Sequence, residues 1–294
     1  MGRREVSFIS GGEQIAAWLY DPAHEGSTPC VVMAHGLGGV REAGLEPYAE
    51  RFAAAGMRVL VFDYRYFGGS TGEPRQQLEI KLQLEDWRTA VAHARSLESV
   101  DAERIGLWGT SFSGGHVITL GAEDGRIGAI VAQNPMADGI AALRELSPRQ
   151  MAGLTVAGIR DEIARLRGRP RVYLPLIGRP GEIAALTNDD AVEGYAAIVP
   201  ERSTFQNRHT AAVDLRLGLY RPVRGASKIS APILVCVTDA DRITPAGPAV
   251  KVAEAAPRGE AIHYPARHFD IYVGELFEQA VADQTAFLVR NLGP

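Results

Sequence analysis

Short apolar runs alternate with amphipathic segments along most of the chain. The runs are rich in Val, Ile and Leu, which is typical of strands that are buried on both faces of a parallel sheet. They lie at residues 31–34, 58–62, 105–110, 129–132, 232–237 and 261–264. The amphipathic segments carry apolar residues at helical spacing, and they lie at residues 46–55, 78–97, 246–256 and 275–291. This alternation predicts an α/β fold with a mostly parallel sheet and helices on both faces.

The beginning of the chain has a different pattern. Residues 5–10 and 14–20 have the composition of short strands, and Gly11, Gly12 and Glu13 between them suit a tight turn. We therefore expect an antiparallel pair of strands at one edge of the sheet.

The alternation of strand and helix stops between Met136 and Lys228. This stretch is rich in proline, has helical spacing at residues 154–166 and 210–219, and contains no β-branched strand run. A structureless loop of this length is implausible in a compact fold. We therefore predict a mainly helical cap at residues 136–228 that roofs a pocket. The catalytic domain would then consist of residues 1–135 and 229–294.

The composition is that of an ordinary folded protein and narrows the possible partners. Hydrophobic residues make up 46% and charged residues 22% of the 294 residues, and 31 basic against 35 acidic residues give a net charge of −4. No long block of one sign occurs, which argues against nucleic acid or an anionic membrane as a partner. The chain start lacks the pattern of a signal peptide, and no window approaches the apolar length of a membrane span. We expect a cytoplasmic protein, and a homodimer stays open.

Cysteine and histidine give no sign of a metal centre. Cys30 and Cys236 are the two cysteines, and each lies within an apolar run, where a reduced core cysteine is expected. The seven histidines are not spaced as a ligand cluster. We therefore expect no disulfide, no metal and no cofactor.

The candidate chemistry centres on Ser111. An apolar run leads into this serine, and residues 116–120 after it can be helical. A serine on a tight turn between strand and helix needs very small neighbours two residues before and after it. Gly109 fits, while Ser113 stands where the G-x-S-x-G pattern has its second glycine. Taken alone, the stretch could equally be a glycine-rich turn that opens a helix.

Other polar residues follow the predicted strands directly. In a parallel α/β sheet, ligands bind outside the carboxyl ends of the strands. Those positions hold His35, Asp63, Ser111, residues 239–241 and His268. A serine hydroxyl becomes a good nucleophile when a histidine takes its proton and a carboxylate orients that histidine. The order Ser, Asp, His along the chain is the one expected of an α/β-hydrolase.

Five motifs in this order make the chain resemble serine hydrolases of the α/β-hydrolase fold. They are HGLGG, DYRYFGGSTG, GTSFSGG, TDADRITP and ARHFDIY. Together they cover the catalytic sheet, about two thirds of the chain, and are far more specific jointly than singly. In the cap, residues 175–181 and 205–207 resemble a branch that includes dienelactone-hydrolase-like proteins and polyketide transferases.

The resemblance assigns a role to each matching residue. It implies Ser111 as the nucleophile, Asp241 as the orienting acid and His268 as the general base, with Asp239 as the rival acid. It also implies a small acyl compound as the substrate, namely a carboxylic ester or thioester cleaved through an acyl-enzyme without a cofactor. Acyl transfer on the same residues and a non-catalytic ligand receptor on the same fold remain the alternatives.

The residues around the predicted nucleophile receive more specific expectations. The backbone N–H groups of Leu37 and Phe112 would form the oxyanion hole. Phe67 and Met136 would line the substrate pocket. We expect His35 to shape the oxyanion loop and His116 to be structural. Asp63 and Arg65 would form a buried or semi-buried ion pair that holds the loop after the strand at residues 58–62.

Overall fold

The computed structural model describes residues 2–23 and 26–293, and within them eight strands form one mixed sheet. The spatial order is β1-β2-β4-β3-β5-β6-β9-β10. The strands are β1 (Gly2–Ser10), β2 (Glu13–Asp21), β3 (Thr28–Ala34), β4 (Arg58–Phe62), β5 (Val100–Thr110), β6 (Ala129–Gln133), β9 (Ile233–Thr238) and β10 (Gly259–Tyr264). Strands β1 and β2 form the predicted antiparallel edge, and β2 also pairs antiparallel with β4. The remaining neighbours in this order, β4-β3-β5-β6-β9-β10, all pair in parallel.

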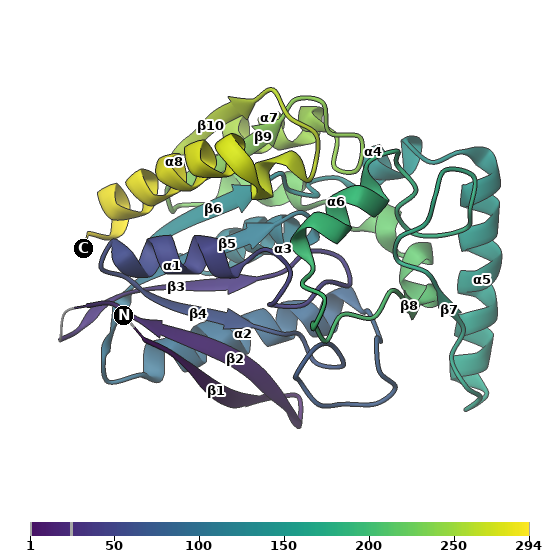
Figure 1. The fold of residues 1–294 in the computed structure, drawn as a ribbon, viewed down its shortest axis with the longest axis horizontal. Helices are drawn as coiled ribbons and strands as arrows, with labels where there is room; N and C mark the ends of the chain where they lie inside the picture. Colours follow the sequence, from purple (N-terminus) through teal and green to yellow (C-terminus); the bar gives the residue numbers. More distant parts are fainter. Residues whose placement is uncertain (1, 24–25, 294) are drawn as a thin grey trace.

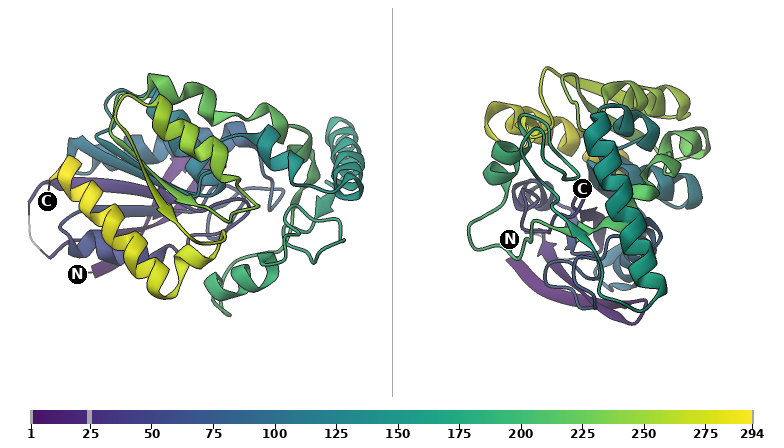
Figure 2. Two further views of the ribbon diagram at one scale, coloured as in Figure 1. Left: turned by 90° about the horizontal axis from the view of Figure 1, so that it is seen from above. Right: turned by 90° about the vertical axis from the view of Figure 1, so that its right-hand side faces the viewer.

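Helices cover both faces of this sheet (Figures 1 and 2), which confirms the predicted α/β architecture. Helices α1 (Glu46–Ala54) and α8 (Gly274–Leu292) pack on one face, and α2 (Ile80–Ser96), α3 (Phe112–Glu123) and α7 (Ala246–Ala255) pack on the other. Side chains alternate along a strand, so β3 contributes Val32 to one core and Val31 and Met33 to the other. Both faces of the central strands are therefore buried, as their continuous apolar runs predict.

Most of the segment that we predicted as a cap lies beyond the carboxyl ends of the parallel strands (Figure 1), whereas its last turn, residues 222–228, packs beside α3 and α7. Its elements are α4 (Gly139–Arg144), α5 (Pro148–Leu166), β7 (Tyr173–Leu174), α6 (Ala191–Ile198), β8 (His209–Thr210) and the 3₁₀ helices η1 (Ala211–Leu215), η2 (Leu217–Leu219) and η3 (Pro222–Lys228). We call residues 136–228 the cap segment. Its division from a separate catalytic domain stays a prediction.

The predicted helix at residues 210–219 is wrong in detail. The segment forms short 3₁₀ turns, and β7 and β8 pair as a small antiparallel ladder. The turns pack closely on α5, because a Cβ added at Gly158 would lie 2.8 Å from Leu215 Cγ and 3.0 Å from the Ala211 oxygen. The Ala212 N–H also donates to the Asp161 carboxylate at 2.9 Å. These contacts hold the turns against α5 and satisfy a backbone N–H group at the start of the segment.

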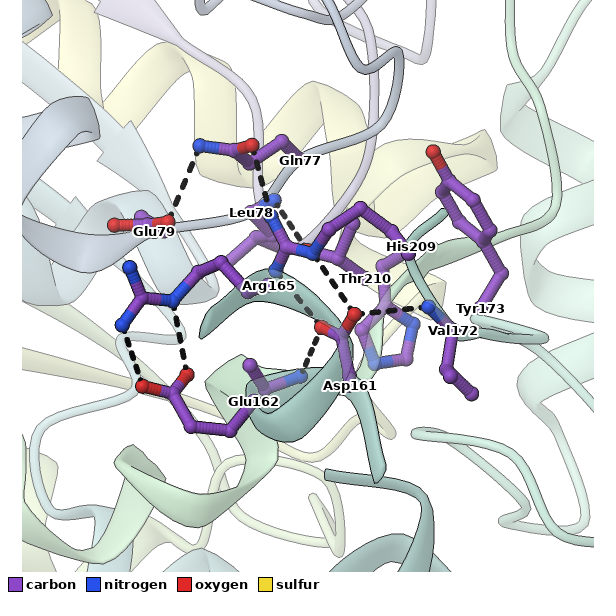
Figure 3. Close-up of polar contacts among 12 residues, drawn as sticks. Gln77, Leu78, Glu79, Asp161, Glu162, Arg165, Val172, Tyr173, His209 and Thr210 are labelled. Atoms are coloured by element: carbon purple, nitrogen blue, oxygen red, sulfur yellow. Dashed lines mark hydrogen bonds and ion pairs between the residues drawn. The ribbon is translucent and has the colours of Figure 1, made fainter. Parts of the chain in front are cut away.

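A buried carboxylate holds this part of the cap segment together (Figure 3). The Asp161 side chain is fully buried and accepts hydrogen bonds from the Arg171 guanidinium at 2.8 Å and from the Val172 N–H at 2.8 Å. Burial raises the pKa of Asp161, but these hydrogen bonds more than offset it and leave the pKa below its ordinary value. Arg171 also donates to Gln77 Oε1 at 2.9 Å, so the cluster joins the cap segment to the stretch before α2.

Two further bonds join β8 to that same stretch. The Thr210 N–H donates to the Gln76 oxygen at 3.1 Å, and Thr210 Oγ1 accepts from the Leu78 N–H at 3.2 Å. The cap segment is thus fixed to the sheet-bearing part of the chain on the side of α2.

The expectations about membranes and cysteines can be compared with the structure. Among residues 2–23 and 26–293, no helix combines the length and apolarity that a membrane crossing needs. Cys30 and Cys236 are buried and free, and burial raises the pKa of each thiol to about 12. Three expectations stay predictions: a cytoplasmic location, no nucleic-acid or membrane partner, and a possible homodimer.

Candidate active site

Ser111 lies on a sharp turn between β5 and α3. Its backbone has φ +56° and ψ −120°, a conformation that non-glycine residues rarely adopt. A Cβ added at Gly109 would lie 2.3 Å from the Ser113 oxygen, and one added at Gly36 would lie 2.9 Å from Ser111 Cβ. Neither position can hold a larger residue without a shift of the backbone. This close approach is the geometry that the sequence predicts for a nucleophile elbow.

Ser113 is small enough for this turn, and its hydroxyl also makes a buried hydrogen bond. It is fully buried, and its Oγ accepts a hydrogen bond from the Tyr64 hydroxyl at 3.0 Å. The Tyr64 hydroxyl in turn accepts from Trp87 Nε1 at 2.8 Å. The serine that replaces the usual glycine therefore completes a buried polar chain between the elbow, the loop after β4 and helix α2.

Replacing Ser113 with glycine should destabilise the protein, although it restores the common motif. The substitution leaves the buried Tyr64 hydroxyl without its acceptor, which costs about 1–3 kcal/mol. Chemical unfolding of the two proteins measures the difference directly. Equal free energies of unfolding would show that the hydroxyl of Ser113 contributes nothing to the elbow.

His268 joins Ser111 to Asp241. Its Nε2 lies 3.0 Å from Ser111 Oγ, and its Nδ1 lies 2.6 Å from Asp241 Oδ2. The side chains of His268 and Asp241 are 3% and 0% exposed. A proton on Nδ1 that is donated to the carboxylate leaves the Nε2 lone pair directed at the serine hydroxyl. The three residues that the sequence places far apart are thus in one hydrogen-bonded line.

The Asp241 carboxylate is held firmly in this position. Oδ1 accepts from the N–H groups of Ile243 and Thr244, both at 2.8 Å, and Oδ2 accepts from the hydroxyls of Thr238 at 2.9 Å and Thr244 at 2.8 Å. Burial raises the pKa of Asp241, but the neighbouring His268 and these donors more than offset it, so the pKa lies below its ordinary value. The carboxylate stays ionised and cannot turn away from the imidazole.

Asp239, the rival acid, has a different environment. Its side chain is 49% exposed, and its Oδ1 lies 2.7 Å from His263 Nδ1 on β10. Among the described residues, its hydrogen-bond partner is this histidine. Asp239 is therefore away from His268, and Asp241 is the carboxylate that contacts it.

Two backbone N–H groups near Ser111 are free to bind an oxyanion. Within residues 2–23 and 26–293, the amides of Leu37 and Phe112 donate to no protein acceptor. Phe112 is the first residue of α3, where the helix dipole adds positive potential. Leu37, Ser111 and Phe112 line the same cavity. The cap segment contributes here too, because the Tyr195 hydroxyl on α6 donates to the Leu37 oxygen at 2.9 Å.

The predicted ion pair between Asp63 and Arg65 is wrong. Asp63 faces the loop after β3, where it accepts from the Arg41 N–H at 2.7 Å and lies 3.4 Å from Arg41 Nε. Arg65 faces α2 and pairs with Asp86 at 2.6 Å. Burial raises the pKa of Asp63 to about 6, although Arg41 acts in the opposite direction. The Asp63 and Arg65 side chains are both buried, but they point in different directions from the chain and pair with different residues.

The two other buried histidines of this region make structural contacts. His35 Nδ1 lies 3.0 Å from the Gly36 oxygen in the loop that carries Leu37, as we expected. His116 lies on α3, with Nδ1 2.7 Å from the Tyr220 hydroxyl and Nε2 3.1 Å from Gln83 Oε1. Burial lowers the pKa of His35 to about 4 and that of His116 to about 3. Both rings therefore stay neutral at physiological pH.

The His116→Gln variant should lose stability less steeply in acid than the wild type. An unfolded histidine takes up a proton below pH about 6.5, while folded His116 does not. The free energy of unfolding therefore decreases as the pH is lowered, by up to about 1.4 kcal/mol per pH unit. Asp63 acts in the opposite direction below pH 6, but it is present in both proteins and cancels. Urea unfolding from pH 8 to pH 4.5 tests this. Plots of the free energy of unfolding against pH should be parallel for the two proteins above pH 7 and diverge below it. Plots that stay parallel down to pH 4.5 would contradict a folded His116 that remains neutral.

Ser111 lies at the junction of two cavities. The larger one spans about 740 Å³, part of which is open to solvent, and Met136 lies on its wall as we expected. The smaller one has about 380 Å³ and includes His268 and Tyr195 in its wall. Phe67 is a wrong prediction: it is fully buried in the core, with its ring centroid 6.4 Å from that of His35, and it lines neither cavity. No sequence signal singled out Tyr195.

The sheet order, the strained elbow and the Ser–His–Asp line define an α/β-hydrolase. A family described as serine aminopeptidase, S33, matches residues 26–268, and the chain belongs to this family. It is 44% identical over 286 residues to the quorum-quenching protein AidA of Acinetobacter baumannii, covering 97% of this chain and 94% of that protein. It is 28% identical over 296 residues to the thiohydrolase aneE of Aspergillus aculeatus, covering 97% and 92%.

A solved structure supports the fold independently. The α/β-hydrolase GrgF from Penicillium sp. sh18 superposes with a TM-score of 0.82 at 23% identity, covering 100% of both chains. The predicted α/β-hydrolase fold and the family resemblance are therefore confirmed, and hydrolase-named relatives place the chain among hydrolases.

Proposed function

We propose that the protein is a serine hydrolase that cleaves a carboxylic ester or thioester through an acyl-enzyme on Ser111. The observation that carries this proposal is the 3.0 Å contact from Ser111 Oγ to His268 Nε2, continued by the 2.6 Å contact from His268 Nδ1 to Asp241 Oδ2. In this role Ser111 is the nucleophile, His268 the general base and Asp241 the orienting acid.

The first half of the reaction forms the acyl-enzyme. Ser111 Oγ attacks the acyl carbonyl carbon while its proton moves to His268 Nε2. The carbonyl oxygen becomes negatively charged and accepts from the free N–H groups of Leu37 and Phe112. When the tetrahedral intermediate collapses, the bond from carbon to the leaving oxygen or sulfur breaks, and the leaving group takes the proton from His268. Asp241 stabilises the imidazolium that exists between these two proton transfers.

The second half returns the enzyme to its starting state. Water gives a proton to His268 and attacks the ester carbon on Ser111, and the same two amides hold the negative oxygen. Collapse releases the carboxylic acid and returns the proton to Ser111 Oγ. An alcohol in place of water would make the same steps an acyl transfer.

The two cavities suggest how a substrate is placed. The larger one is walled mainly by apolar side chains, including Met136, Leu154 and Val213, and suits an acyl chain. The smaller one adjoins His268, so it suits the leaving group and then the attacking water. The presence of a thiohydrolase among the relatives supports testing thioesters beside oxygen esters.

A chain-length series of p-nitrophenyl esters and matching acyl thioesters tests the proposed function. We expect saturable turnover with a preference for one range of acyl lengths. Product analysis with and without an added alcohol separates hydrolysis, which releases the acid, from transfer, which forms a new ester. A protein that binds these compounds without cleaving any of them would be a receptor, and the proposal would be wrong.

Replacing Tyr195 with phenylalanine should lower kcat about 10-fold with a smaller change in KM. The Tyr195 hydroxyl holds the Leu37 carbonyl at 2.9 Å, and a looser loop would misplace the adjacent oxyanion donor, to which the rate is sensitive. Tyr173→Phe is a matched control, because the Tyr173 hydroxyl also joins the cap segment to a backbone carbonyl, that of Arg75 at 2.9 Å, away from both cavities. Equal kinetic losses in the two variants would contradict a specific role for Tyr195.

A further inference from the structure

One carboxylate stands out in the wall of the larger cavity. Asp214, in η1, lines this cavity together with Ser111. An adjoining cleft, lined mostly by polar side chains and open to solvent, shares Glu145, Leu146, Asn188 and Arg242 with the cavity, and these residues mark where the two meet. Asp214 does not line that cleft. Asp214 therefore belongs to the part of the lining that the cavity does not share with the cleft.

Most of the residues that line this cavity with Asp214 are apolar. The neighbouring positions Val213 and Leu217 and the α5 residue Leu154 line the same cavity. The Asp214 side chain is only 9% exposed. A carboxylate in such a place is costly unless hydrogen-bond donors satisfy its oxygens.

The protein supplies only part of what this carboxylate needs. His209 Nε2 lies 3.1 Å from Asp214 Oδ2 and 3.3 Å from Oδ1, and among the described residues it is the only donor to Asp214 that the hydrogen bonds include. An ionised carboxylate has about four acceptor sites. Most of these sites remain open for a donor that enters the cavity.

Asp214 is also held rigidly. The His209 ring is fully buried, and His209 pairs with Leu174 in the ladder of β7 and β8. The next residue, Thr210, is bonded to the stretch before α2, and Figure 3 shows His209 and Thr210 beside the buried Asp161 cluster. Because the Asp214 carboxylate is held in one place, it can accept a hydrogen bond from a donor at one position along a bound acyl chain and not from a donor at the next position.

We propose that Asp214 selects substrates whose acyl chain carries a neutral hydrogen-bond donor, a hydroxyl or an amide N–H, at one fixed position from the reacting carbonyl. This inference rests on the proposed function, since the cavity receives the acyl chain. A neutral donor satisfies the free carboxylate sites without bringing a second charge into an apolar cavity, whereas an ammonium group would have to lose its hydration as well.

Kinetics with a set of matched esters tests the selection. One saturated p-nitrophenyl ester is compared with analogues in which a hydroxyl is moved along the chain one carbon at a time. We expect kcat/KM to peak at one hydroxyl position, about 10- to 100-fold above the unsubstituted ester, since a hydrogen bond to a charged group has this strength. A chain with an amino group at that position should be a poorer substrate than the hydroxylated chain.

The variant Asp214→Asn gives a readout that a merely structural role would not move. Its amide keeps the shape and can still accept from His209, but it can offer N–H donors to the cavity. The preference for the hydroxylated chain should fall at least about 10-fold, and a chain with a ketone at the same position should gain relative to it. Glu193→Gln is the control, because Glu193 is an exposed carboxylate on α6 that lines neither cavity; its ratios should equal those of the wild type.

Binding to the Ser111→Ala variant separates this inference from the proposed function. Calorimetry with the free hydroxylated and unsubstituted acids should show tighter binding of the hydroxylated acid, and adding Asp214→Asn should remove the difference. That result would support the inference even if no ester were cleaved. Equal binding, no peak along the hydroxyl series, unchanged ratios in Asp214→Asn, or a preference for the amino chain would each overturn it, while ester cleavage itself would still support the proposed function.

Discussion

The Ser111→Ala variant should lose nearly all ester turnover, with kcat falling by at least about 10⁴-fold. Without the hydroxyl no acyl-enzyme can form, and only the oxyanion donors and substrate binding remain to accelerate attack by water. The fold should persist, because the substitution removes one oxygen and leaves the turn small. Active and variant proteins are compared by steady-state kinetics on the best p-nitrophenyl ester, with circular dichroism to verify folding.

An exposed serine provides the control for this experiment. Ser230→Ala removes a hydroxyl outside both cavities and should retain wild-type rates. A folded Ser111→Ala variant that retains more than about a tenth of the activity would contradict a covalent mechanism at this residue.

The Asp241→Asn variant should lower kcat by about 10³- to 10⁴-fold. The amide can present N–H to His268 Nδ1, so the ring would carry its proton on Nε2 and could no longer accept the proton of Ser111. The loss of the negative charge also removes the stabilisation of the imidazolium. Rates at saturating ester measure the effect.

Asp239→Asn is the matched comparison, because it makes the same change two residues away. Asp239 contacts the half-exposed His263 rather than His268, so this variant should keep turnover close to that of the wild type. A larger loss in Asp239→Asn than in Asp241→Asn would transfer the role of the acid to Asp239.

The sheet could be predicted because its signal is local. Continuous apolar runs require burial on both faces, and short connections to amphipathic segments then favour parallel strands. The cap segment was harder, because the structure at residues 210–219 depends on distant partners. The 3₁₀ turns there contact the Asp161 carboxylate and pack into the space left by Gly158, and both residues lie about 50 positions earlier in the sequence.

The line of Ser111, His268 and Asp241 could be predicted because each residue follows a strand, and the carboxyl ends of parallel strands meet at one edge. The partners of charged side chains could not. Asp63 and Arg65 are two residues apart, yet the turn between them directs one to Arg41 and the other to Asp86. Phe67 was misplaced for a similar reason, since an aromatic residue in a loop can turn into the core as well as towards a pocket.

The polar pocket residues from the cap segment were the least predictable. Tyr195 and Asp214 are an ordinary tyrosine and an ordinary aspartate in the sequence, with no motif around them. Only the packing of α6 and η1 over the strand ends brings them to the cavities beside Ser111. Such residues depend on long-range contacts, which is why sequence periodicity indicates the roof but not its polar groups.

Labelling with a fluorophosphonate that reacts with activated serines tests the central claim most directly. The account predicts one covalent adduct per chain, located by mass spectrometry of peptides at Ser111, with none in Ser111→Ala and much slower labelling in Asp241→Asn than in Asp239→Asn. An intact protein that takes up no label, or that is labelled equally in the presence and absence of Ser111, would contradict it.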